Sequence, residues 1–95
     1  MPTITIDISD HAIERFWERS GDKTIDLARD RIERMLNRSK PVVPRREERD
    51  GMDKYKPGTQ YRVAGTWVFI ITHGICVTCY DMESRHRIQR VFKRV

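Results

Sequence analysis

The segment Thr66–Thr72 constrains the fold most, because it is apolar almost throughout. A β-branched and aromatic run of this length is typical of a strand that is buried on both faces. The residues Tyr61–Ala64 before it and Ile75–Tyr80 after it predict two further strands. Gly65 breaks the first connection, and His73-Gly74 predicts a hairpin turn between the second and third strands. The C-terminal half therefore predicts an antiparallel meander around a buried central strand.

An N-terminal strand and two helices are predicted before the meander. Thr3–Ile8 alternates and is rich in β-branched residues, as strands are. Ser9 or Asp10 is the expected cap of a first helix, and Gly21 suits the left-handed residue that ends it. Thr24 is the expected cap of a second helix that runs to about residue 37. That helix has apolar residues at helical spacing, namely Ile25, Ala28, Ile32, Met35 and Leu36.

The remaining segments are a connection and a tail. Pro41–Pro44 is expected to be extended, because proline restricts its own backbone and that of the preceding residue. Residues 45–58 are dense in charges of both signs and predict a long exposed loop, either an RNA-contacting flap or a solvated connection. In the tail, Glu83–Val95, apolar residues at helical spacing favour a final helix over a strand.

These elements predict an α+β fold in a single domain over residues 1–95. Two helices would pack on one face of a small antiparallel sheet. The net charge of +5 and the pI near 9.6 are compatible with a nucleic-acid partner. The longest apolar run is too short to span a membrane, and the N-terminus has no signal-peptide pattern. We therefore expect a cytoplasmic protein, with no membrane partner and with Cys76 and Cys79 reduced.

One face of the first helix carries residues suited to phosphate chemistry. His11, Arg15 and Arg19 are four positions apart and share a helix face. The positive end of a helix dipole disfavours the charged form of a histidine near the helix start, whereas the neighbouring Asp10 favours it. A neutral histidine can act as a general base. Arginines can hold a phosphate and stabilise developing charge. In the ordinary alternative, His11 is an exposed or hydrogen-bonded helix-start residue, and the arginines pair with neighbouring carboxylates.

Strand alternation predicts a second set of site groups in the meander. Cys76, Thr78 and Tyr80 are expected on one face of the last strand, and Cys79 on the other. Thr78 and Tyr80 would then point together at a ligand, although both are also ordinary strand residues. The two thiols would point apart, which argues against a zinc site with His73. No metal or cofactor is predicted.

The tail adds a basic cluster, of which Arg85 and Arg87 are the first arginines. Its six members are Arg85, His86, Arg87, Arg90, Lys93 and Arg94. Such a cluster either tracks a nucleic-acid backbone or forms a solvated face.

Two motifs together suggest a family. The run His11-Ala12-x-x-Arg15-x-x-x-Arg19, followed by Val77-Thr78-Cys79-Tyr80, resembles the barnase–EndoU–colicin–RelE-like ribonuclease superfamily. The closer likeness is to its small members in bacterial toxins and phage genomes. The resemblance implies a RelE-like or colicin D-like fold, with two N-terminal helices on a four-stranded antiparallel sheet. The long charged loop at 45–58 and the basic tail after Met82 depart from the family pattern.

The resemblance implies a metal-independent endoribonuclease of toxin type, in which the ribose 2′-hydroxyl attacks the adjacent phosphate. It assigns proton transfer to His11, phosphate binding to Arg15, and site roles to Thr78 and Tyr80. The substrate-binding residues would be Arg19, Arg85 and Arg87. RNA and a cognate protein inhibitor would be the partners. The alternative is a non-enzymatic phage or bacterial module that contacts nucleic acid or inhibits a host protein. Catalysis would require His11 and Thr78 to face one cleft, whereas binding requires only a basic surface.

Overall fold

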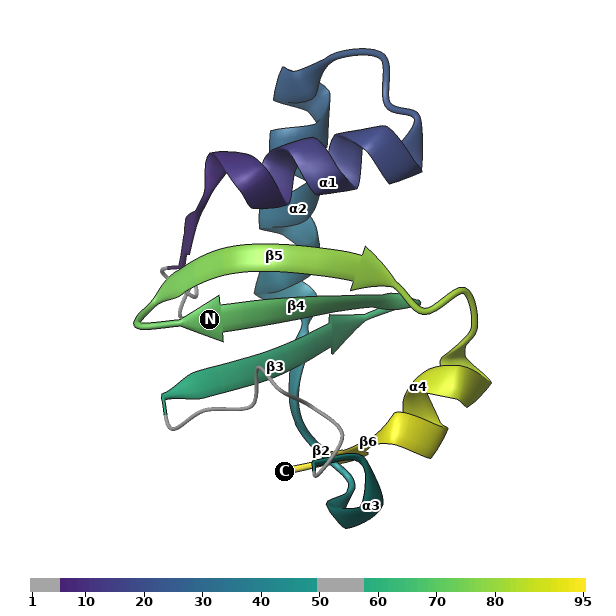
Figure 1. The fold of residues 1–95 in the computed structure, drawn as a ribbon. Helices are drawn as coiled ribbons and strands as arrows, with labels where there is room; N and C mark the ends of the chain where they lie inside the picture. The colour runs from purple at the N-terminus through teal and green to yellow at the C-terminus, as the bar shows by residue number, and fades with distance from the viewer. Residues whose placement is uncertain (1–5, 50–57) are drawn as a thin grey trace.

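The computed structural model describes residues 6–49 and 58–95, and it has the predicted α+β architecture (Figure 1). In chain order the elements are β1 (Asp7–Ile8), α1 (Asp10–Ser20), α2 (Ile25–Arg38), β2 (Lys40–Pro44), α3 (Arg46–Arg49), β3 (Thr59–Ala64), β4 (Trp67–Thr72), β5 (Ile75–Asp81), α4 (Arg85–Val91) and β6 (Phe92–Arg94). No helix in the described ranges is long and apolar enough to cross a membrane.

The strands form one sheet, larger than predicted. Its six strands lie in the order β1-β5-β4-β3-β2-β6. The meander β3-β4-β5 is antiparallel, as predicted. β2 and β6 extend it at one edge with antiparallel pairing, and β1 adds to the other edge in parallel. The sheet is therefore mixed, and the segment after α4 is a strand that the sequence did not predict.

Both N-terminal helices begin and end at the predicted residues. The Ser9 hydroxyl caps α1 by accepting a hydrogen bond from the Ala12 N–H at 3.1 Å. Gly21 ends α1 in the left-handed region with a φ of 73°. The Thr24 hydroxyl caps α2 by accepting from the Leu27 N–H at 3.2 Å. These caps confirm the predicted ends of the two helices.

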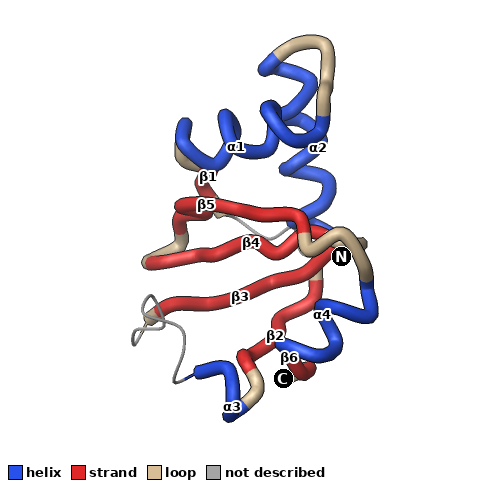
Figure 2. Tube along the Cα trace, turned by 45° about the vertical axis from the view of Figure 1, so that its right-hand side comes forward, coloured by secondary structure: helices blue, strands red, loops and turns tan. Residues whose placement is uncertain are grey.

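Each face of the sheet carries its own hydrophobic cluster. On the α1–α2 face, Phe16 packs on Trp67 with ring centroids 4.5 Å apart. On the opposite face, which we call the α4 face, Ile88 lies in a cluster with Tyr61 and Phe92. Figures 1 and 2 show α4 beside β2 and β6, away from α1 and α2. The direction of a strand side chain therefore decides which helix layer it meets.

A β-bulge in β5 changes which of its side chains share a face. The pairing with β4 passes from Cys76 directly to Thr78, which leaves Val77 as the extra residue. Cys76 and Cys79 consequently both lie in the cluster beneath α1. The prediction that these thiols point apart, and that Cys76 shares a face with Thr78 and Tyr80, was wrong. Strict alternation holds only while the strand is regular.

Parts of two predicted segments lie outside the described residues. Residues 1–5 of the N-terminal strand and residues 50–57 of the charged segment belong to these parts. Within the described part of the charged segment, residues 46–49 form the one-turn helix α3 instead of a loop. Arg45, just before α3, donates from its backbone N–H to the Val91 carbonyl at 2.8 Å and from Nε to the Gln89 carbonyl at 2.7 Å. These hydrogen bonds join the segment to α4.

Candidate functional site

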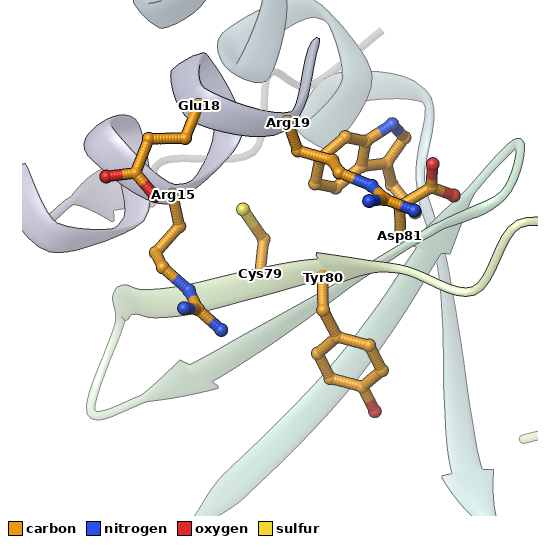
Figure 3. Close-up of a pocket in the computed structure, with 7 residues that line it drawn as sticks. Arg15, Glu18, Arg19, Cys79, Tyr80 and Asp81 are labelled. Atoms are coloured by element: carbon orange, nitrogen blue, oxygen red, sulfur yellow. The ribbon is translucent and has the colours of Figure 1, made fainter.

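The arginines predicted on α1 line a small pocket beside β5. Arg15 and Arg19 both extend from α1 toward that strand (Figure 3). The pocket has a volume of about 230 Å³. Its lining residues are Arg15, Glu18, Arg19, Trp67, Cys79, Tyr80 and Asp81. Among the described residues, neither His11 nor Thr78 lines it. The pocket therefore lacks the predicted proton-transfer group.

The sheet separates the groups that the ribonuclease hypothesis requires together. Thr78 pairs with Ile70, and Tyr80 pairs with Val68. Both partners belong to the cluster on the α4 face, and directly paired residues point to the same face. Figure 3 shows the Tyr80 hydroxyl directed away from α1. His11 is exposed on the first turn of α1, on the opposite side of the sheet. The expected convergence of His11 with Thr78 is absent from the described residues.

The two thiols and the phenol of β5 are buried enough to resist ionisation. Burial, reinforced by Tyr61, raises the pKa of Tyr80 to about 12. Burial likewise raises the pKa of Cys76 and of Cys79 to about 12, with Arg15 acting weakly in the opposite direction on Cys79. A phenol and two thiols with these pKa values stay protonated near pH 7. They are therefore poor general bases and poor nucleophiles.

Arg19 and Arg87, two predicted substrate-binding residues, meet one carboxylate. Arg19 forms an ion pair with Glu83 at 2.5 Å, and Arg87 approaches the other oxygen of Glu83 at 3.8 Å. Arg19 is therefore a surface ion-pair residue, as the alternative interpretation expected, but its partner Glu83 is distant in the sequence.

In residues 6–49 and 58–95, no three His, Cys, Asp or Glu side chains lie close enough together to hold a metal ion.

A larger groove lies on the α4 face, and we call it the basic groove. It has a volume of about 580 Å³ and lies between α4 and the strands β2, β3 and β6. Its basic rim consists of Arg38, Lys40, Arg85, Lys93 and Arg94. Its apolar floor consists of Val42, Val63, Ile88 and Phe92. No Asp or Glu of the described ranges lines this groove. The electrostatic potential inside it must therefore favour anions.

The register of the strands explains why cations that are distant in the sequence surround the apolar floor of the basic groove. Lys40 of β2 pairs with Val63 of β3, and Arg94 of β6 pairs with Val42 of β2. Because Val42 and Val63 lie on the α4 face, Lys40 and Arg94 are directed to that face as well. Arg85 reaches the same groove from the first turn of α4.

Sequence reasoning found part of the basic groove and missed the rest. Arg85 was a predicted substrate-binding residue, and Lys93 and Arg94 belong to the predicted basic tail. Arg38 and Lys40 were missed, because they lie at the junction of α2 and β2 and approach the tail only through the pairing of β2 with β6. A signal was present in the closely spaced cations of residues 38–40, directly before an extended segment.

The site must be interpreted from its own chemistry. Comparisons of this chain with known protein families, with curated proteins and with solved structures find no match.

Proposed function

We propose that the protein binds nucleic acid, with RNA as the expected partner, through the basic groove. The supporting observation is the set of five cationic residues that line one concave surface, which no described acidic residue lines. Lysine and arginine contacts to phosphates supply most of the sequence-independent affinity for nucleic acids. The protein's net charge of +5 adds a long-range attraction of the same sign.

The state of the rim side chains supports this proposal. Elsewhere on the surface, Arg19 pairs with Glu83, and Arg31 pairs with Asp22 at 2.8 Å. Within the described part of the chain, none of the five rim cations has a carboxylate within 4.0 Å. A bound polyanion would supply the counter-charges that the described residues do not place at the rim. The rim of the basic groove is therefore better suited to bind a phosphate backbone than the small pocket beside β5.

Cleavage of RNA is the weaker of the two functions that the sequence suggested. A 2′-hydroxyl attack needs a proton-transfer group within hydrogen-bond reach of the reacting atoms. His11 lies on the α1–α2 side of the sheet, whereas Thr78 and Tyr80 face the α4 side. This separation favours binding without catalysis.

The test compares two triple variants that remove the same charge. Lys40→Gln, Arg85→Gln and Arg94→Gln together neutralise three rim positions. The matched control is Lys23→Gln with Arg29→Gln and Arg34→Gln, at exposed positions that do not line the groove. Binding of a fluorescent RNA oligonucleotide is followed by anisotropy between about 50 and about 200 mM salt.

The groove variant should bind more weakly and should depend less steeply on salt. For three lost phosphate contacts on a single strand, the slope of log K against log salt should fall by about 2. The control variant should stay close to the wild type. Equal losses in both triple variants would mean that binding is diffuse, and the proposed groove function would be wrong.

A further inference from the structure

We infer that the basic groove takes an unpaired nucleic-acid strand, with a base against the apolar floor and the flanking phosphates at the basic rim. This inference rests on the proposed function and specifies its ligand. Its basis is the combination of the floor and the rim in one concave site.

The apolar floor distinguishes between the two forms of nucleic acid. Phe92 is 2% exposed and packs on Tyr61 with ring centroids 5.4 Å apart, while Val63 is only partly buried. The floor is thus a packed apolar surface that remains open to the groove. A double helix presents sugars and phosphates outward and keeps its base faces stacked inside. Only an unpaired nucleotide can bring a base face down onto such a floor.

The size of the groove agrees with one seated nucleotide. Its volume of about 580 Å³ lies inside the range of about 300–1,000 Å³ that is usual for pockets that enclose small ligands. Proteins that read a duplex project a helix or a β-ribbon outward into a DNA groove. Here the site is concave, so a duplex would touch the rim and leave the floor in water.

Two further features of the groove lining fit an unpaired nucleic-acid strand. The rim cations come from four elements around the floor, namely α2, β2, α4 and β6. Successive phosphates of one strand can therefore each meet a cation. Gln89 also lines the groove with an exposed side chain. An amide can donate to and accept from the edge of an unpaired base.

Three probes of similar charge test the inference with the full-length protein. The first is a single-stranded RNA of about 12 nucleotides, a length within the usual site sizes. The second is a hairpin with the same number of phosphates whose bases are paired, and the third is the same strand with abasic residues. The intact single strand should bind about tenfold more tightly than either other probe at equal salt, because only it supplies unpaired bases.

A side-chain variant provides a second measurement that leaves the charge unchanged. Gln89→Ala should weaken binding of the intact single strand and leave hairpin binding unchanged. The matched control is Gln60→Ala, at an exposed β3 position outside the groove. Circular dichroism and thermal unfolding should show that both variants are folded.

The possible outcomes separate this inference from the proposed function. Equal binding of all three probes that still depends on the rim cations would overturn the unpaired-strand inference and keep nucleic-acid binding. Tighter binding of the hairpin would do the same. Binding that does not depend on the rim cations would overturn both.

Discussion

Arg19 of α1 forms an ion pair with Glu83, which lies in the turn between β5 and α4. Their side chains are 56% and 60% exposed, so the pair contributes at most about 1 kcal/mol. Glu83 also adopts a φ of 70°, in the left-handed region that glycine tolerates best. The backbone at this residue is therefore as important for stability as the ion pair.

Replacing Glu83 separates these two contributions. Both Glu83→Ala and Glu83→Gly remove the carboxylate, but only glycine relieves the positive φ. We expect Glu83→Gly to be more stable than Glu83→Ala by about 1 kcal/mol, the usual cost of a side chain in this region. Urea denaturation of the two variants measures the difference. A glycine variant less stable than the alanine variant would show that the turn is not strained.

Arg62 supports the junction between α2 and β2 from the neighbouring strand. Its Nε donates to the Ser39 hydroxyl at 2.7 Å, and a terminal nitrogen donates to the Ser39 carbonyl at 2.8 Å. The Ser39 hydroxyl in turn donates to the Leu36 carbonyl at 2.6 Å. Burial lowers the pKa of Arg62, although arginine stays charged at neutral pH.

Arg62→Ala should therefore destabilise the protein by about 1–3 kcal/mol, because it removes charge-assisted hydrogen bonds at a partly buried site. Arg29→Ala, on the exposed side of α2, should change stability by less than about 0.5 kcal/mol. Chemical denaturation of both variants gives the comparison. Similar stabilities for the two would contradict the role of Arg62.

Local features of the fold could be predicted from sequence, and long-range features could not. Ser9, Gly21 and Thr24 cap helices within a few residues of their own positions, so these helix ends could be predicted from the sequence. The strand β6 gains its partner from β2, about fifty residues earlier in the chain. No local pattern distinguishes such a short strand from the end of a helix. The parallel addition of β1 depends on tertiary contact in the same way.

The side-chain directions in the candidate site were even harder to predict from the sequence, because they too depend on long-range pairing. Arg15 and Tyr80 were predicted as site residues, and both line the pocket beside β5. The bulge at Val77 and the two-faced sheet determine where the side chains of β5 point. A one-residue insertion shifts every later side chain to the opposite face, and the sequence of β5 contains no glycine or proline to reveal it.

The buried thiols make stability sensitive to alkaline pH. Burial raises the pKa of Cys76 and of Cys79 from 9.0 to about 12. Well below pH 9.0 both thiols are protonated in the folded and unfolded chains. Above it the unfolded chain loses protons that the folded chain retains, so stability should fall as pH rises toward about 12.

Thermal unfolding over this alkaline range should show the loss. A Cys76→Ala, Cys79→Ala double variant should have a shallower pH dependence, although its cavities lower stability at every pH. Tyr80→Phe is a second control, since the pKa of Tyr80 is also raised to about 12. If the double variant followed the wild-type slope, the thiols would not be the titrating groups.

His11 tests whether the protein has any catalytic function. If the protein binds nucleic acid without cleaving it, RNA incubated with the wild type and a chelator should stay intact on a denaturing gel. His11→Ala should bind the RNA within about twofold of the wild type, because His11 is exposed and lies outside the basic groove.

If His11 were instead a positioned acid or base, it would contribute about 100- to 10,000-fold to the rate of RNA cleavage. Chelator-resistant cleavage by the wild type that disappears in His11→Ala would overturn the binding-only proposal. The active centre would then lie around His11 on α1.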